Sequence, residues 1–541
     1  MTPIVTTPRG PTPAQLRGTA GLPATEAVVT APTRAIAWAA VLVTGCARLV
    51  YLASDRAAFN GDEAVTGIMA QNILHGASYG FYPGQRYGGT VEPYLQALFL
   101  LVFRLPQNPL TLRLPQVCLS MATCYLIWQC ARRCVPDPRR ALVAPVIFAV
   151  GPWFNVISGA SSLGFYVAGT AAATGALYCA LRVMEHDSAD GPRRQRGRQL
   201  PWVAALGLCS GLALWQTLST ACVVLPALLW AAPAAGASLR SAATWATAGI
   251  AGSLPVWTQA LTTGNLPLPN DSPPPTSALT RLTRLLGPEF REFIGVSYSH
   301  DHGGAPRAVQ LATTAGLVLL YCLVLVRRRR QVVALLTFDR VHRHPVDLLL
   351  IAPIITLVMF ACSPSAWYTG TPRYLFTAYP LFAIALAAIP ARISHRAVYR
   401  VVAVGLVTSV VALSAGYFRG AVVVPTTRDR DAAFRRVAAE LKRSGETRVY
   451  ADYWTAMPLQ YAANRSLDVA VFHGANRFGE MQRSVARAAA PVYVGNILDG
   501  SAALIARALT NHGVTYRTRM VDFVEIFSDL SSAVRPSALG L

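Results

Sequence analysis

Three carboxylates stand out in one stretch between the first two long apolar segments of the chain. Asp62 and Glu63 form an adjacent pair, and Glu92 comes just before a short apolar run. A carboxylate in such a place can accept the proton of an attacking hydroxyl group. Each acid taken singly also fits ordinary helix capping, which stabilises a helix N-terminus by about 0.3–1 kcal/mol. The loops predicted to lie outside the membrane are otherwise poor in acids, so the three acids together favour a catalytic centre.

The segments around these acids predict two short helices joined by a loop. Apolar residues at helical spacing from Ala64 predict an amphipathic helix at the membrane interface. The loop 79–89 is rich in glycine and aromatic residues, and its Gln85 and Tyr87 either line an acceptor groove or form a structural turn. The apolar run 91–103 predicts a second helix, too short to cross a bilayer, which needs about 20 residues.

The composition indicates that these helices belong to a membrane protein. Of the 541 residues 53% are hydrophobic and only 14% are charged, whereas soluble domains average about 25% charged residues. This balance excludes a soluble enzyme, a disordered scaffold and a small disulfide framework. We predict a mainly α-helical, polytopic fold of about eleven transmembrane helices, at 35–53, 114–131, 141–157, 163–181, 201–216, 218–235, 243–261, 308–326, 346–362, 374–390 and 398–418.

The distribution of arginine predicts the orientation of these helices. Alternate connecting segments carry 22 arginines against 7 acids, which is typical of the cytoplasmic side. The N-terminus is then cytoplasmic and the C-terminus extracytoplasmic. The formal net charge of +22, which by itself suggests nucleic-acid binding, is therefore mostly a topology signal, and no nucleic-acid partner is expected.

The same orientation divides the chain into three regions. Residues 1–33 lack periodicity and are predicted to form a disordered cytoplasmic tail. Residues 34–418 form the transmembrane domain, whose outer loop 54–113 bears the three acids. Residues 419–541 change to the composition of a soluble protein, and their short apolar runs alternate with helical stretches. This tail is predicted to be a small extracytoplasmic α/β domain.

A short cluster, His300-Asp301-His302, is a second candidate for metal chemistry. Adjacent ligands can bind a metal ion, but this cluster lacks a third partner at a suitable spacing. A solvated loop flanked by glycines is the alternative.

Several motifs resemble a known enzyme family. The segment Gly61-Asp62-Glu63-Ala64, the pattern Gly84-Gln85-x-Tyr87-x-Gly89 and Glu92 before an apolar helix resemble glycosyltransferase family 39 and its PMT-like branch, which has the GT-C fold. Protein mannosyltransferases and lipid A aminoarabinose transferases are distant relatives of that branch. The segments Arg373-Tyr374-Leu375 and Tyr450-Ala-Asp-Tyr-Trp454 also resemble motifs of these enzymes.

The resemblance implies residue roles. It assigns catalysis to the pair Asp62 and Glu63, with Asp62 as general base, and substrate binding to Glu92, Gln85, Tyr87, Arg373 and Tyr374. Relatives sometimes bind a divalent metal at the position of Glu92. The segment Val91-Glu92-Pro93-Tyr94 lacks a second proline or lysine seen in many relatives, so a metal at Glu92 does not follow directly. Arg373 is either an interfacial anchor or a ligand of a lipid phosphate.

Three functions remain open from the sequence. The first is an inverting glycosyltransferase of the cell membrane, surrounded by membrane lipids. It moves a hexosyl or pentosyl group from a polyprenyl-phosphate donor to a glycan, lipid or protein acceptor. The second is a polytopic transporter or lipid flippase, and the third is an inactive GT-C-like subunit. Transporters usually place ionisable groups inside their spans, whereas the predicted spans hold almost none apart from Arg48. We therefore predict the enzyme.

Overall fold

A computed structural model describes most of the chain. The described residues are 30–54, 57, 59–188, 196–236, 238–268, 277–297, 304–338, 344–363, 372–388, 390–392, 394–420 and 427–541. The predicted tail lies outside them except for its last residues, where helix α1 begins at Ala31. The cluster 300–302 also lies outside the described residues.

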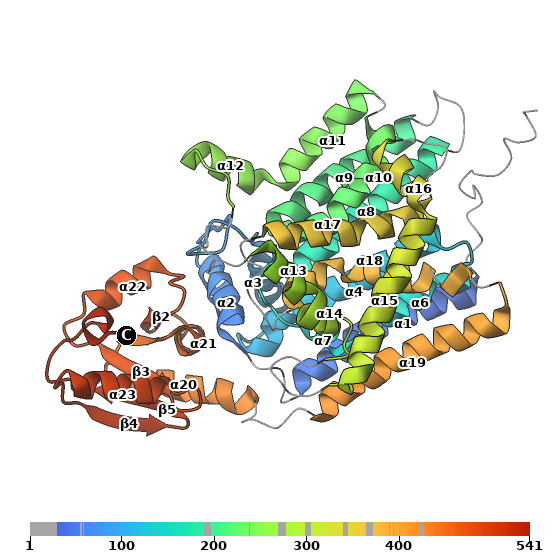
Figure 1. The fold of residues 1–541 in the computed structure, drawn as a ribbon. Coiled ribbons are helices and arrows are strands. Elements are labelled where there is room, and N and C mark those ends of the chain that lie inside the picture. Colours follow the sequence, from blue (N-terminus) through green and yellow to red (C-terminus); the bar gives the residue numbers. More distant parts are fainter. Residues whose placement is uncertain are drawn as a thin grey trace, which may run out of the picture.

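Long apolar helices dominate the first three quarters of the protein (Figure 1). Among the described residues, seven helical segments are long and apolar enough to cross a membrane. They are α1 (Ala31–Ala53), α4 (Pro109–Cys134), α8 (Tyr166–Ser188), η2 with α10 (Leu218–Thr220 and Ala221–Ala235), α15 (Arg307–Arg327), η4 with α17 (Pro345–Asp347 and Leu348–Cys362) and α19 (Arg396–Gly420). The prediction of a mainly helical membrane protein is confirmed.

The predicted count of eleven spans is not confirmed, because several expected spans are interrupted. The stretch 141–157 is divided among α5 (Pro138–Ala141), α6 (Val143–Val150) and α7 (Trp153–Ser158). Gly151 at φ +96° and the following proline end α6. The stretch 243–261 is divided into α11 (Leu239–Gly252) and α12 (Leu254–Thr263), and 374–390 into η6 (Pro372–Ala378) and α18 (Tyr379–Ala388). The expected span 201–216 lies in α9 (Arg196–Gln216).

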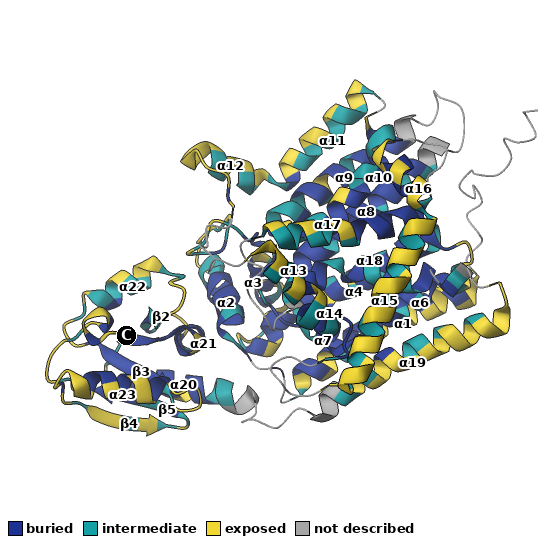
Figure 2. Ribbon diagram, viewed as in Figure 1, coloured by how far each residue is buried: buried dark blue, intermediate teal, exposed yellow. Residues whose placement is uncertain are grey.

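The exposed faces of this helical region are apolar. Helices α15 and α19 run along its outside and are mostly exposed, whereas α8 and α10 lie in its interior (Figure 2). Leu319 and Val401 are among the exposed aliphatic side chains. Large exposed apolar surfaces of this kind are typical of contact with lipid.

Residues 427–541 form an α/β domain at one end of the helical region (Figure 1). Its five-stranded sheet has the order β2-β1-β3-β5-β4, with β1 parallel to β2 and β3, and β5 antiparallel to β3 and β4. Four strands match predicted apolar runs, whereas β4 was missed because it begins with three polar side chains and is largely exposed. The elements are α20 (Thr427–Arg443), β1 (Arg448–Asp452), α21 (Tyr453–Ala463), β2 (Asp468–His473), α22 (Gly479–Ala486), β3 (Val492–Asn496), α23 (Ser501–Asn511), β4 (Arg517–Val521) and β5 (Val524–Ser528).

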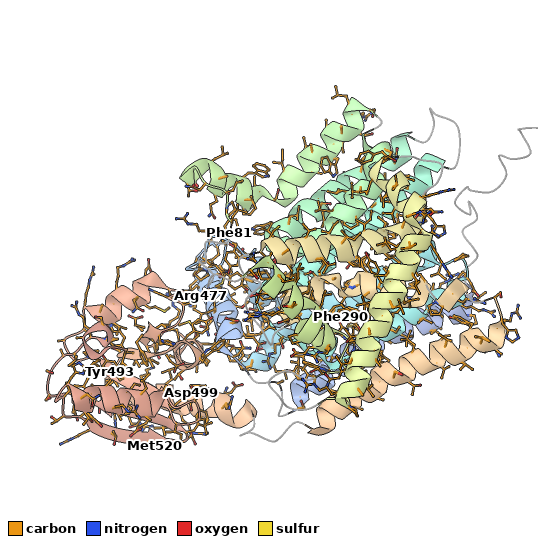
Figure 3. The ribbon with its side chains drawn as sticks, viewed as in Figure 1. Phe81, Phe290, Arg477, Tyr493, Asp499 and Met520 are labelled. Carbon is orange, nitrogen blue, oxygen red and sulfur yellow. The ribbon has the colours of Figure 1, made fainter. Side chains whose placement is uncertain are left out.

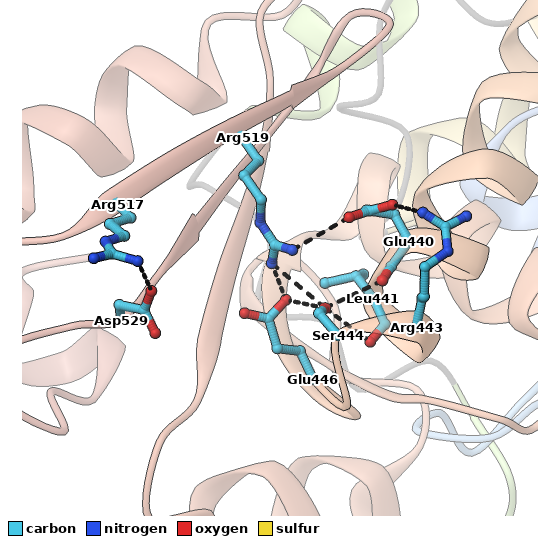
Figure 4. A network of polar contacts seen from close by, with 8 residues as sticks. All are labelled: Glu440, Leu441, Arg443, Ser444, Glu446, Arg517, Arg519 and Asp529. Carbon is cyan, nitrogen blue, oxygen red and sulfur yellow. Dashed lines mark hydrogen bonds and ion pairs between the residues drawn. The ribbon is translucent and has the colours of Figure 1, made fainter.

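Ion pairs attach the edge of this sheet to α20 (Figure 4). Arg519 of β4 contacts Glu440, at 3.3 Å, and Glu446. Arg436 of α20 pairs with Asp522 at 2.7 Å. These partly exposed pairs fix the position of α20, although each contributes little stability on its own.

Helix α2 (Gly61–Leu74) connects the two parts of the molecule. It packs against α3 (Val91–Phe103) on the membrane side and against α21 of the C-terminal domain. Residues 63–71 are all buried, so the prediction that this helix is amphipathic is wrong. A Cβ atom on Gly67 would lie 2.7 Å from Leu112 and 2.8 Å from Tyr461. Glycine at this position therefore permits α2 to fit between both neighbours.

Candidate active site

Asp62 lies in the first turn of α2, where the side chain of Asn60 caps the helix by accepting from Glu63 N–H. Two donors from distant parts of the chain hold its carboxylate. Arg373 Nη1 donates to Oδ2 at 2.9 Å, and the Tyr453 hydroxyl donates to Oδ1 at 2.7 Å. The Asp62 side chain is still 23% exposed. The two hydrogen bonds thus fix the orientation of the carboxylate, which is still accessible to solvent.

Arg373 reaches Asp62 from η6, which begins at a proline. Its guanidinium lies 5.4 Å from the ring centre of Tyr374, which packs edge-on against Tyr166 at 6.0 Å. Of the two residues predicted from this motif, Arg373 therefore contacts Asp62, and Tyr374 lies against Arg373. Their predicted contact with substrate stays a prediction.

Tyr453 comes from the C-terminal domain and was missed as a site residue. It begins α21, whose N-terminus is capped by Asp452 accepting from Trp454 N–H and Thr455 N–H. Burial, followed by the negative charge of Asp62, raises the pKa of Tyr453 above its ordinary value. The phenol therefore stays protonated and able to donate. The only sequence signal was its place in the segment Tyr450–Trp454.

Glu63 has a different environment from Asp62. Arg113 of α4 donates to both of its oxygens, with Nε–Oε1 at 2.8 Å and Nη2–Oε2 at 2.5 Å. Ser162 N–H also donates to Oε1 at 2.8 Å, and the Glu63 side chain is fully buried. Arg113 in turn donates to the Ala57 carbonyl. This arrangement holds the start of α2 against α4 and leaves Glu63 remote from solvent.

Glu92 also uses its oxygens inside the fold. Oε1 accepts from Val167 N–H and Ala168 N–H at 3.1 and 3.2 Å, so it caps the N-terminal end of α8. Oε2 accepts from Gln116 Nε2 at 3.2 Å. Burial raises the pKa of Glu92 to about 8. A fully buried carboxyl of raised pKa does not fit a divalent metal ion, and no group of three His, Cys, Asp or Glu gathers within the described residues.

The loop 79–89 joins the membrane side to the C-terminal domain. Gln85 donates to the Tyr87 carbonyl at 3.0 Å and accepts from Arg477 Nη1. Arg477 lies at this junction in Figure 3, 6.0 Å from the ring centre of Tyr453. A Cβ atom on Gly84 would lie 2.2 Å from the Asn476 carbonyl oxygen, so the backbones approach closely here. Gln85 is therefore connected to Asp62 through Arg477 and Tyr453.

Comparison with known proteins identifies the fold that carries this site. Residues 89–258 match the family model described as dolichyl-phosphate-mannose-protein mannosyltransferase. ArnT from Cupriavidus metallidurans, solved bound to undecaprenyl phosphate, is similar over 93% of this chain and 99% of its own, with a TM-score of 0.59 and 12% identity. The chain has the GT-C glycosyltransferase fold.

Other solved GT-C structures agree with this assignment. The same ArnT in the apo state gives a TM-score of 0.56 at 12% identity, over 93% of this chain and 98% of that one. The Archaeoglobus fulgidus oligosaccharyltransferase in complex with Zn and sulfate gives 0.52 at 12% identity, over 91% of this chain and 73% of that one. No curated protein sequence matches the chain significantly. The resemblance drawn from the motifs is confirmed, although Asp62 itself precedes the matched residues.

Proposed function

We propose that this GT-C protein is a membrane glycosyltransferase that moves a sugar from a polyprenyl-phosphate donor to an acceptor hydroxyl, with inversion at the anomeric carbon and Asp62 as general base. The observation that carries the proposal is the accessible Asp62 carboxylate held by Arg373 and Tyr453. The structure of ArnT with undecaprenyl phosphate supports a donor of this class. The sugar is a hexosyl or pentosyl group.

In the proposed reaction, Asp62 and not Glu63 accepts the proton of the acceptor hydroxyl. Each Asp62 oxygen accepts one described hydrogen bond and keeps a second lone pair. The acceptor oxygen forms a bond to the anomeric carbon while its proton passes to Asp62. The bond between that carbon and the phosphate oxygen breaks, and the polyprenyl phosphate leaves with the electron pair. A guanidinium beside this centre, that of Arg373, stabilises the charge that develops on the phosphate.

The remaining site residues act through position in this proposal. Glu63 fixes the start of α2 through Arg113, and Glu92 fixes the start of α8. Gln85 and Tyr87 shape the loop that meets the C-terminal domain. Because Glu92 has this structural role, the proposed chemistry takes place at Asp62 and uses no metal ion at Glu92.

A transporter or flippase was the alternative from the sequence, and Arg48 is the group that would favour it. Arg48 is fully buried in α1, where its guanidinium donates to the carbonyls of Thr44 and Asn155 and lies 5.0 Å from the Phe148 ring centre. These contacts are internal to the packed helices. Arg48 therefore fits a structural role better than a transport pathway.

We further propose that α2 and the C-terminal domain lie on the extracytoplasmic side, with the N-terminus in the cytoplasm. The positive loops at the opposite ends of the helices support this orientation. A reporter that is active only outside the cytoplasm, fused after Gly420, should be active. An inactive reporter in a stably inserted fusion would overturn the orientation.

Transfer from radiolabelled polyprenyl-phosphate sugars, measured in membranes, tests the function. Asp62→Asn keeps the shape of the side chain but removes its basicity, and we expect a loss of about 10²–10⁴-fold in rate. Asp529→Asn, in the C-terminal domain and exposed, is the matched control. An Asp62→Asn protein as fast as wild type would refute the general base.

A further inference from the structure

A cleft of about 680 Å³ opens between the membrane side and the C-terminal domain. One wall is the end of α2 and the loop after it, with Asn72, His75 and Tyr79. The opposite wall comes from α21, α22 and the segment between them, and includes Arg465 and Glu480. Its volume lies within the range of about 300–1,000 Å³ that is typical of sites for small organic ligands.

The side chains of this cleft offer donors, acceptors and aromatic surface together. Asn72 Nδ2 donates to the Tyr79 hydroxyl at 3.0 Å. Glu480 and Arg465 line the same cleft as Tyr79, and burial raises the pKa of Tyr79. Arg465 and Glu480 are exposed and have no hydrogen-bond or ion-pair partner among the described residues. Phe478 adds a second aromatic ring to the lining.

The strand beside the cleft is closed to an added peptide strand. β2 is an edge strand of the sheet, and an open edge would recruit an extended peptide through its backbone groups. Instead, Val469 N–H donates to Gln460 Oε1 at 2.8 Å. Gln482 accepts from Val471 N–H and donates to the Val471 carbonyl, both at 3.0 Å. Side-chain amides therefore already occupy the groups that a peptide would need.

The cleft lies beside the proposed catalytic centre. Arg477 lines it and lies against the ring of Tyr453, whose hydroxyl donates to Asp62. A ligand in the cleft is consequently separated from the base by two side chains. This is a suitable place for the part of an acceptor that follows the reacting hydroxyl.

We propose that the cleft binds the acceptor as an oligosaccharide, an inference that rests on the proposed glycosyl transfer. Sugar hydroxyls both donate and accept, which matches Arg465 and Glu480 facing one ligand from one wall. The apolar C–H faces of sugar rings match the rings of Tyr79 and Phe478. Positive and negative lining residues occur together, as in Arg465 and Glu480, whereas a phosphate-rich lipid acceptor would require an excess of positive charge.

A binding experiment tests the cleft without requiring turnover. The full-length Asp62→Asn protein in lipid nanodiscs is mixed with neutral oligosaccharides released from the polysaccharide of the host envelope, after removal of lipid and protein. Saturation-transfer NMR reports the bound sugar protons. We expect the double substitution Arg465→Ala and Glu480→Ala to weaken binding about tenfold or more, because two hydrogen bonds to charged groups are lost. Arg507→Ala, on the exposed face of α23, is the control.

Each outcome decides the proposal. Equal binding by the double variant and its parent overturns it, and so does an absence of saccharide binding by the parent under conditions where the fold is intact. In the transfer assay, the same double substitution in the wild-type background should raise KM for the acceptor with little change in kcat. If binding depends on the cleft but wild-type protein transfers no sugar, the proposed function fails and the oligosaccharide site stands.

Discussion

In the proposed mechanism, the hydrogen bond from Tyr453 to Asp62 makes catalysis depend on the C-terminal domain. Tyr453→Phe removes only the hydroxyl that donates to Oδ1 at 2.7 Å and keeps the ring that packs beside Gly61 and Trp454. A hydrogen bond to a charged group is worth about 1.5–3 kcal/mol, and about 1.4 kcal/mol corresponds to tenfold in rate. Because Asp62 is partly exposed, water replaces part of the lost interaction. We therefore expect kcat/KM to fall about tenfold to a hundredfold.

The assay is the initial rate of sugar transfer from the polyprenyl-phosphate donor, measured together with the melting temperature. Tyr516→Phe is the matched control, since Tyr516 lies in the same domain and packs edge-on against Phe527. The melting temperature of Tyr453→Phe should stay close to that of wild type. A Tyr453→Phe protein with wild-type kcat/KM would refute the idea that this domain positions the base, even if Asp62→Asn were inactive.

Three further substitutions probe the surroundings of Asp62. Glu63→Gln breaks the buried ion pair between Glu63 and Arg113, and removing one partner of such a pair should destabilise the fold by about 3–5 kcal/mol, which thermal unfolding measures. Gly67→Ala places a Cβ atom 2.8 Å from Tyr461, so it should separate α2 from α21, cost about 1–3 kcal/mol and increase proteolysis of the C-terminal domain. The pKa of Glu92 is raised to about 8 in the folded state, so between about pH 4.5 and 8 folding takes up a proton. The free energy of unfolding should therefore fall as pH rises through this range, and Glu92→Gln should remove that slope.

Matched controls separate these effects from general disturbance. Glu525→Gln, a half-buried residue of β5, serves both carboxyl variants. Gly405→Ala serves Gly67→Ala, because a Cβ atom there would meet nothing within 4 Å. Loss of transfer in Glu63→Gln without any change in melting temperature would assign chemistry to Glu63 instead. A pH slope that persists in Glu92→Gln would show that another group takes up the proton.

Much of the fold was predictable because it depends on local composition. Stretches of about 20 uncharged residues form helices in lipid wherever they pack, and four of the five strands coincide with apolar runs of the tail. The breaks at Gly151 and after Gly252 were not predicted, since a hydropathy window averages over the residues that interrupt a helix. β4 was missed because an exposed edge strand with arginine side chains carries no apolar pattern.

The surroundings of the site residues were harder to predict from the sequence. Asp62 and Glu63 are neighbours of the same chemical type, and a motif cannot distinguish them. About 100° separates successive side chains on a helix of 3.6 residues per turn. Asp62 therefore faces Arg373 and Tyr453, whereas Glu63 faces Arg113 inside the helical region.

The sequence alone determined that the chain enters a membrane, that its acids gather before two short helices, and that its tail forms an α/β domain. These properties reside in short segments, so periodicity and composition express them. Only the tertiary structure decided which carboxylate is accessible and which are buried. It also brought Tyr453 to Asp62 across 391 residues, because contacts at such separation depend on how domains pack rather than on any local pattern.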